Sequence, residues 1–366
     1  MTDAAGIPVV GADGNPIYNL YAYMPIEISL QGAYMAGLKV ERPVFAGGKI
    51  LAANKIAGIS VKMAKDNIKL QKMNKISEVD SACWIYVSVQ EKVQLAQTSV
   101  NMLSALLKRV QNSYNAGLVN QNEVLKVQVE YNKATLDLQK AKSGRELARM
   151  SLCRVTGLSF ETPVVTDSII NCFTNLLSQL GNEDVTQRPE YQLLERQVAL
   201  EEQKIKTIRA DYLPSIGVSV GYNYIGGIKF NGTDYNQDNL SVMGSVKIPL
   251  FNWGEGKQKV VAAKASKEIK ELELAKNSQL LQLEIEKAKL NLQDASFRIQ
   301  TATDALQQAV ENLRISNNNY EVGRELMTDL LIARTQWEKA YNEVIEAKTE
   351  YKLQETEYLR VTSSLH

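Results

Sequence analysis

Few side chains in this 366-residue sequence are suited to catalysis. The single histidine is the last residue, His366, which excludes His-based triads, histidine zinc sites and most general acid–base schemes. The sequence also lacks the GxGxxG, Walker-type, GxSxG and HExxH patterns. Two acids do recur at matching places: Glu123 and Asp329 lie 206 residues apart, each shortly after a YxxG segment. The sequence therefore predicts a protein that is not an enzyme and that carries one acid beside each copy of a repeated turn.

The composition excludes several kinds of partner. Lys and Arg number 42 and Asp and Glu 41, so the formal net charge of +1 is too small to attract nucleic acid. The sequence also contains no local basic patch that could bind it. The odd number and the spacing of Cys83, Cys153 and Cys172 predict free thiols, with no metal site and no cofactor. No stretch approaches the roughly 20 apolar residues of a membrane-spanning helix, and the N-terminus MTDAAGIPVVGADGNP does not resemble a signal peptide. Taken alone, these features indicate a soluble cytoplasmic protein.

The dominant feature is an internal repeat with a fixed offset of 206 residues. Its anchors in the first copy are Pro43, Phe45, Gly48, Tyr114, Gly117, Leu125, Ala134, Lys142 and Leu147. Their counterparts are Pro249, Phe251, Gly254, Tyr320, Gly323, Leu331, Ala340, Lys348 and Leu353. A repeat of this length indicates that a whole module was duplicated within one elongated body, because solenoid units span only about 20 to 50 residues.

Alternating apolar residues predict strands ahead of each helical region. Residues 216–224 alternate between apolar and small or polar side chains, and a second strand is expected over 240–250. We expect a loop over 232–239, which is rich in Gly, Asn and Asp, between the two. The first copy keeps one clear strand, over 26–40. Strands this long suit a barrel wall better than a globular sheet, although a half-buried sheet of a soluble protein stays an alternative.

Two long helical hairpins are predicted after the strands. Residues 49–115 and 257–319 contain no proline and little glycine, so each is expected to form a helix of about 60 residues, roughly 90 Å long. Heptad spacing predicts a first seam of Ala96, Val100, Leu103, Leu107, Val110 and Tyr114, and a second of Ala302, Leu306, Ala309, Leu313, Ser316 and Tyr320. We expect the chain to turn at Gly117 and Gly323, where glycine supplies the left-handed backbone that ends a helix.

The order of these elements resembles that of the TolC-like outer-membrane efflux family. The resemblance is carried by LPSIGVSVGYNY, by the strand endings RPVFAGGK and IPLFNWGEGK, and by the turns YNAGLV and YEVGRE, and it covers residues 24–366. It implies a mainly α fold with β. Long antiparallel coiled-coil helical hairpins would form a periplasmic α-barrel, and the strands would belong to a transmembrane β-barrel, in two tandem structural repeats.

This resemblance divides the chain into seven segments. We expect an extracellular loop or incomplete first strand over 1–23, a β-barrel strand over 24–48, a long helical hairpin over 49–157, a linker over 158–187, a helix leading to the barrel over 188–212, a β-barrel hairpin over 213–253 and a second long helical hairpin over 254–366. The repeat would place a counterpart of the leading helix ahead of residue 6. We therefore expect that the sequence begins late, without its export signal, that helix and the first strand.

The resemblance implies an outer-membrane channel of a tripartite efflux or type I secretion system. The protein would be a homotrimer in outer-membrane lipid, with one twelve-stranded barrel and a periplasmic extension. It would serve as a passive exit duct for substrates delivered by a periplasmic adaptor (membrane fusion) protein and an inner-membrane pump of the RND or ABC type. Because the pump chooses the substrate, efflux of drugs, metals or proteins cannot be distinguished from this chain.

The resemblance also implies two kinds of site at the turns. Adaptor hairpins would dock on the tips, for which the candidates are Tyr114, Ala116, Gly117, Leu118, Tyr320, Val322, Gly323 and Arg324. The tunnel entrance would be constricted by Glu123, Asp329, Tyr320 and Glu325. In a trimer each acid would form a ring of three carboxylates, which attract cations and repel one another. The family usually carries an arginine at the position of Glu325, and neighbouring Arg324 is expected to compensate.

Simpler interpretations stay open at each level. The tips can be plain helix turns without a partner, and the acids can be solvated surface residues. A soluble coiled-coil scaffold, or a non-functional fragment, explains the heptads and the balanced charge, but it does not explain alternating strands placed at the same register before each hairpin. A periplasmic adaptor would carry paired lipoyl-like half-motifs, which this sequence lacks.

Overall fold

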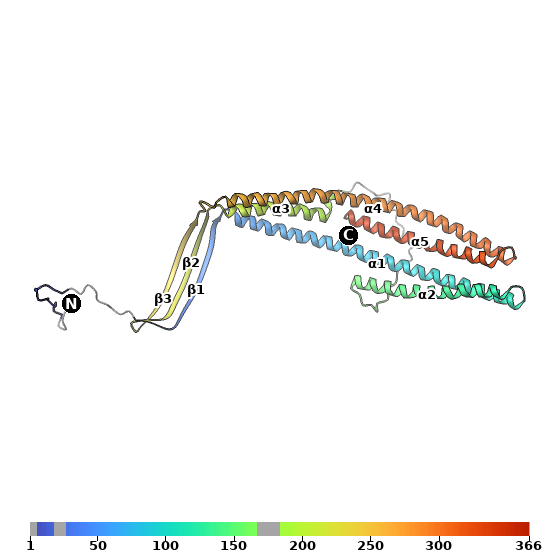
Figure 1. Ribbon diagram of the computed structural model, residues 1–366, viewed down its shortest axis with the longest axis horizontal. Helices are drawn as coiled ribbons and strands as arrows, with labels where there is room; N and C mark the ends of the chain where they lie inside the picture. The colour runs from blue at the N-terminus through green and yellow to red at the C-terminus, as the bar shows by residue number, and fades with distance from the viewer. Residues whose placement is uncertain (1–5, 18–26, 167–183, 366) are drawn as a thin grey trace. The chain divides into compact units, whose positions relative to one another are not determined.

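The computed structural model describes residues 6–17, 27–166 and 184–365. The elements follow in the order β1, α1, α2, α3, β2, β3, α4 and α5, with one short 3₁₀ turn, Val185–Gln187, ahead of α3 (Figure 1). Parts of the predicted segment 1–23 and of the predicted linker 158–187 lie outside the described residues, as do Cys172 and His366. The chain forms two compact units, unit 1 within 1–53 and 204–262 and unit 2 within 54–203 and 263–366.

Unit 1 contains a three-stranded antiparallel sheet in the order β1–β2–β3. Its strands are β1 Ile28–Ala46, β2 Ser215–Phe230 and β3 Thr233–Lys247. The register places Val40, Val220 and Val242 side by side across the three strands, where they form an apolar row. These three side chains are 61%, 43% and 71% exposed, so the described part of the chain leaves the row largely uncovered.

A tight turn joins β2 to β3, and the loop predicted over 232–239 is wrong. Asn231 and Gly232 have φ values of 48° and 80°, as a type I′ hairpin turn requires. The backbone N–H of Asn231 donates to the Glu27 carbonyl at 2.9 Å, and its Oδ1 accepts from the Glu27 N–H at 2.8 Å. Residues 233–239 therefore extend β3 alongside β2.

The two helical hairpins have matching lengths and registers. The first consists of α1 Lys49–Asn115 and α2 Gln121–Thr156, and the second of α4 Glu255–Glu321 and α5 Met327–Val361. Both α1 and α4 contain 67 residues. Each follows a glycine with a left-handed backbone, Gly48 with φ 85° and Gly254 with φ 79°. The shorter helix α3, Pro189–Ala210, precedes β2. The 206-residue offset therefore fixes where both long helices begin and end.

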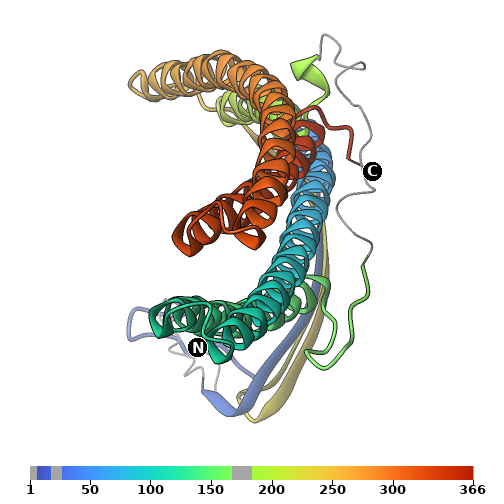
Figure 2. The same cartoon turned by 90° about the vertical axis from the view of Figure 1, so that its right-hand side faces the viewer.

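The hairpins of unit 2 lie side by side (Figure 2). A cluster of buried residues, Leu95, Trp337 and Ile345, joins them. In the second repeat every predicted seam residue from Ala302 to Tyr320 is buried or half-buried. In the first repeat the buried residues over 95–114 of α1 are Leu95, Ser99, Leu103, Leu106 and Val110. The predicted Ala96 and Leu107 are only half-buried, and Tyr114 is 39% exposed. The buried stripe is displaced because α1 packs against α5 as well as against α2.

Candidate functional site

The two hairpin turns have the same backbone geometry. Gly117 and Gly323 have φ values of 75° and 73°, which only glycine adopts without strain. The N–H of Leu118 donates to the Ser113 carbonyl at 2.9 Å, and the N–H of Arg324 donates to the Asn319 carbonyl at 2.9 Å. These six-residue bonds are the Schellman pattern that satisfies the last carbonyls of a helix. The YxxG segments are therefore C-terminal caps that reverse the chain.

The predicted tip residues mostly face solvent. Leu118 is 77% exposed and Val322 is 66% exposed, so each turn presents an apolar side chain to solvent. Ala116, Gly117, Gly323 and Arg324 are also exposed. A Cβ placed on either glycine would meet nothing within 4 Å, so the backbone at both turns is open to a partner. Tyr320 differs from this set because it is half-buried.

Tyr320 and Glu123 join the two hairpins beside the turns. The Tyr320 hydroxyl in α4 donates to Oε2 of Glu123 in α2 at 3.3 Å. Burial, and then the charge and hydrogen bond of Glu123, raise the pKa of Tyr320 to about 12. The tyrosine therefore stays protonated, and able to donate, throughout the physiological range. This contact brings together two residues that the sequence assigned to the same entrance.

The other predicted entrance residues lie in different surroundings. Asp329 is exposed, although it occupies the same place in the second repeat as half-buried Glu123. The Glu325 carboxylate accepts a hydrogen bond from Ser316 of the same hairpin. A groove of about 500 Å³ brings Glu123, Tyr320 and Glu325 together between the hairpin ends. Within one chain, this groove contains the first predicted acid and not the second.

An arginine that the sequence analysis missed closes one side of this groove. Arg109 of α1 pairs with Glu321 of α4 at 2.6 Å and donates to Asn317 at 3.4 Å. Val110, which lines the groove, also belongs to a buried cluster with Leu106, Val127, Met327 and Leu330, which both hairpins contribute. The groove is therefore lined by both charged and apolar side chains.

The sequence profile of the outer membrane efflux protein family matches residues 25–158 and 182–360. The chain belongs to this family. The two matched segments contain one strand-and-hairpin repeat each, as the internal duplication predicts. None of the curated proteins compared with this efflux protein matches its sequence.

Solved structures of bacterial outer-membrane proteins share the fold of this efflux protein. The outer membrane protein VceC of Vibrio cholerae superposes with a TM-score of 0.74 at 15% identity, covering 92% of this chain and 87% of that chain. The Campylobacter jejuni CmeC outer membrane channel gives 0.72 at 14% identity, covering 92% and 77%. The open state of the Neisseria gonorrhoeae MtrE outer membrane channel gives 0.72 at 15% identity, covering 91% and 80%. The efflux protein therefore has the predicted TolC-like fold, helix-rich with antiparallel strands in two repeats.

Two further features were sought among the described residues of this efflux protein: a membrane-spanning helix and a metal site. None of its described helices combines the length and apolar composition needed to span a membrane. Its described residues also contain no group of three or more histidine, cysteine or carboxylate side chains that is placed to hold a metal ion.

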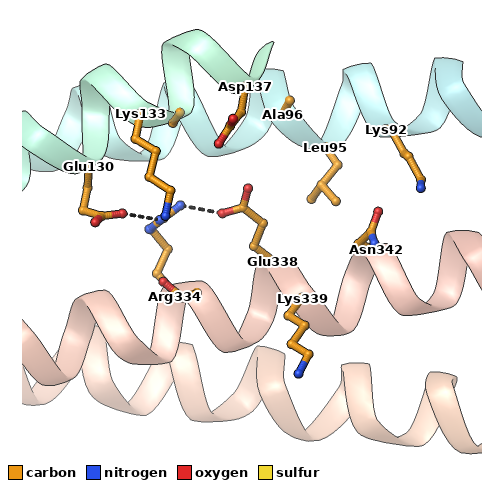
Figure 3. A pocket seen from close by; sticks show the side chains of 12 residues that line it. Lys92, Leu95, Ala96, Glu130, Lys133, Asp137, Arg334, Glu338, Lys339 and Asn342 are labelled. Carbon is orange, nitrogen blue, oxygen red and sulfur yellow. Dashed lines mark hydrogen bonds and ion pairs between the residues drawn. The ribbon is translucent and has the colours of Figure 1, made fainter. Parts of the chain in front are cut away.

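A buried arginine of the efflux protein links three helices farther along the hairpins. Figure 3 shows its contacts with Glu130 and Glu338. The Arg334 side chain is 8% exposed, and its Nη1 donates to Ser99 Oγ at 2.6 Å and to Glu338 at 2.8 Å. Its Nη2 donates to Glu130 of α2 at 3.3 Å. The guanidinium of α5 therefore bonds to both helices of the first hairpin.

The sequence contained weak signals for this network. Ser99 lies four residues after Leu95 and four before Leu103, so a serine interrupts an otherwise apolar stripe. Arg334 lies four residues before Glu338, a spacing that places opposite charges on one helix face. Neither signal identifies the helix that the side chain contacts, which is why the network was missed.

Proposed function

We propose that this protein is the outer-membrane channel of a tripartite efflux or type I secretion system. In this role it is a passive exit duct for substrates that an inner-membrane pump delivers. The observation that carries the proposal is the pair of 67-residue helices in a chain of the outer membrane efflux family. At 1.5 Å per residue, each helix is about 100 Å long, which suits a duct that extends from the outer membrane through the periplasm.

The channel is a homotrimer whose sheets join edge to edge in outer-membrane lipid. β1 and β3 are the outer strands of the described sheet, and lipid does not tolerate unpaired strand edges. Closure therefore needs further copies of the chain. The exposed row of Val40, Val220 and Val242 then contacts the hydrocarbon, as the outward face of a barrel does.

The two turns dock on a periplasmic adaptor protein that connects the channel to an RND or ABC pump. Exposed Leu118 and Val322 offer apolar contacts beside Gly117 and Gly323, where the backbone is open. Tyr114, Ala116, Tyr320 and Arg324 flank this surface. Their occurrence at the same place in both turns favours docking over a plain turn, because a partner would remove this apolar surface from water.

Glu123 and Asp329 act at the tunnel entrance, where each forms a ring of carboxylates in the trimer. Such rings attract cations, and their mutual repulsion favours opening. Tyr320 restrains Glu123 through its hydroxyl in the closed entrance, and Ser316 restrains Glu325. The entrance opens when these contacts between and within the hairpins are released.

The test is to express the gene at its own locus, fractionate the membranes and measure native mass and bilayer conductance. A trimer in the outer membrane that conducts ions supports the proposal. A soluble monomer or dimer overturns it in favour of a coiled-coil scaffold. Co-purification with an adaptor that Leu118→Asp and Val322→Asp abolish, while Glu161→Gln leaves it unchanged, supports docking at the tips.

A further inference from the structure

We infer that one side of α1 binds a polymer that carries carboxylates at intervals, the peptidoglycan of the periplasm. Peptidoglycan meets α1 only if the protein is the proposed channel, so this inference rests on the proposed function. The surface that binds is a line of four lysines in unit 2, here called the lysine stripe: Lys62, Lys65, Lys69 and Lys72.

The first part of α1 is strongly basic. Residues 49–75 contain seven lysines and one acid, Asp66. The Asp66 side chain is 5% exposed and pairs with Arg196 of α3, so it does not neutralise the lysines around it. No basic patch was expected from the sequence, because the charges of the whole chain balance and other residues separate the lysines. The helix brings four of these lysines together and thereby corrects that expectation.

The lysine stripe follows one edge of the packed face of α1. Its members are spaced by three, four and three residues, which places them on one side of a helix. Each lysine comes one residue before a buried or half-buried residue: Met63, Asp66, Leu70 and Met73. All four lysines are exposed, and none makes an ion pair or a side-chain hydrogen bond with another described residue. The stripe is therefore an unpaired line of positive charge.

The second repeat shows that the shared fold does not require these lysines. Their counterparts 206 residues later are Glu268, Glu271, Ala275 and Ser278. Even so, α4 forms a helix of the same length as α1. In α4, moreover, Lys259, Lys267 and Lys270 each pair with a glutamate three or four residues away. The unpaired stripe is therefore particular to the first repeat.

The unpaired charges of the stripe oppose helix formation. Successive lysines lie three or four residues apart, a spacing at which like charges destabilise a helix. A single solvated lysine needs no explanation, but three consecutive repulsive contacts do. A partner with negative charges converts this repulsion into attraction. The absence of acids from the stripe is then a property of the binding surface.

The position of the stripe favours a polymer over a membrane surface. Lys62 lies 13 residues after Lys49, where α1 begins, and Lys72 lies 23 residues after it, about 20 and 35 Å along the helix axis. In the proposed channel α1 leads from the barrel into the periplasm. Lipid head groups attract charges only within about one Debye length, which is about 8 Å at physiological ionic strength. The stripe therefore lies beyond the reach of the outer membrane.

Peptidoglycan matches the stripe in charge and in form. Its stem peptides carry free carboxylates at intervals along a polymer, and four ammonium groups within about 15 Å of helix can contact several of them at once. Lysine suits a mobile partner, because its compact charge lies at the end of a flexible stem. Each contact is weak by itself, and their number gives a binding that salt weakens. Such contacts hold the duct where it passes through the cell wall.

The first test measures how much of the protein, held in nanodiscs of zwitterionic lipid, sediments with purified peptidoglycan sacculi. The stripe variant replaces all four lysines of the stripe by glutamine. The control variant Lys257→Gln, Lys264→Gln, Lys276→Gln, Lys287→Gln removes the same charge from exposed positions of α4. The stripe variant is expected to bind at least about tenfold more weakly than the wild type, since the contacts act together, and the control is expected to bind like the wild type. Equal weakening in both variants overturns the inference.

Two further measurements identify the partner. Binding to sacculi is expected to fall as the salt concentration rises, and sacculi whose carboxylates have been converted to neutral amides are expected to lose it. Binding that survives this conversion overturns the inference. Capture of the wild type by phosphatidylglycerol vesicles and not by sacculi also overturns it, in favour of a lipid surface.

Thermal unfolding separates binding from a structural role. The stripe variant is expected to unfold at the same temperature as the wild type or at a higher one, because repulsion within α1 has been removed. A lower unfolding temperature shows that the lysines serve the fold and contradicts the inference. A wild type that forms a conducting trimer but does not sediment with sacculi overturns the stripe and leaves the channel standing. A wild type that never reaches the outer membrane overturns both.

Discussion

Arg109 Nη1 lies 2.6 Å from Oε1 of Glu321, so an ion pair joins the last turns of the two 67-residue helices. The repeat counterparts of these residues are Ile315 and Asn115, which cannot form such a pair. The ion pair is therefore specific to the contact between hairpins of one chain. Both side chains are 51% exposed, so water and salt weaken their attraction.

Removing this ion pair is expected to affect gating more than stability. Arg109→Ala should lower the free energy of unfolding by less than about 1 kcal/mol, because exposed pairs contribute little. In the proposed channel it should raise the open fraction in bilayer recordings, since one contact between the hairpin ends is lost. A double-mutant cycle with Glu321→Ala measures the coupling. A coupling above about 2 kcal/mol, or one that 1 M salt does not reduce, contradicts this account.

The contribution of Tyr320 to the free energy of unfolding is expected to disappear at high pH. Its pKa is raised from the usual value of 10.0 to about 12, so its contribution is complete below about pH 10 and is lost as the pH rises through about 12. Urea midpoints should therefore fall more steeply over this interval for the wild type than for Tyr320→Phe. Tyr341→Phe, which keeps the Tyr320–Glu123 bond, is the control and should follow the wild type. Parallel curves for all three proteins would exclude the assignment.

Arg334→Ala is expected to destabilise the protein by about 3 to 5 kcal/mol, because it leaves two partly buried carboxylates without their partner. The triple variant Arg334→Gln, Glu130→Gln, Glu338→Asn reproduces the amides found at the repeat counterparts. It should recover most of the loss, as judged by denaturant unfolding. If the triple variant is as unstable as Arg334→Ala, the network's charge balance is not what stabilises this contact.

The turn glycines are required for their backbone conformation and not for space. Gly117→Ala and Gly323→Ala should each cost about 1 to 2 kcal/mol, since φ is positive at both and nothing surrounds the added Cβ. Gly58→Ala in α1, where a Cβ is also unobstructed, should instead stabilise by about 0.5 to 1 kcal/mol. Thermal unfolding of the three variants separates the two effects. A stabilising Gly117→Ala would refute the capping role.

Asp329→Asn should weaken block of the proposed channel by multivalent cations, because the neutral amide removes a ring of charge. Glu123→Gln should have a smaller effect, since Tyr320 already binds this carboxylate. Glu161→Gln, an exposed acid outside the hairpins, serves as the control. The measurement is the blocking concentration in a planar bilayer. Unchanged block in Asp329→Asn would remove the ring assignment.

Helix positions could be predicted from the sequence because the repeat transfers each boundary from one copy to the other. Gly117 and Gly323 end their helices with nearly the same φ, as their shared YxxG context predicts. The start of β3 at Thr233 was missed because the many polar residues of 232–239 suggested a loop, although Asn231–Gly232 is a signal for a tight turn. These residues join β3 because β2 supplies backbone hydrogen-bond partners, which composition does not reveal.

Contacts between the hairpins could not be predicted in the same way. The heptads of α1 and α5 show which faces are apolar, but they do not show which helix each face meets. Ser99 and Arg334 therefore became recognisable as partners only in the folded chain. Equal spacing likewise predicted equal surroundings for Glu123 and Asp329, yet among the described residues only Glu123 accepts a hydrogen bond from a tyrosine of its own chain.

Because α1 and α4 have equal lengths, the distance over which this protein extends depends on both helices together. Losing one heptad from the first hairpin alone would shorten it by about 10 Å per helix and leave its turn out of level with the other. Any change in reach, whether by evolution or by engineering, must therefore be made twice, in whole heptads and at positions related by the same offset. A change in one hairpin alone would first disturb any function that needs both turns at the same level.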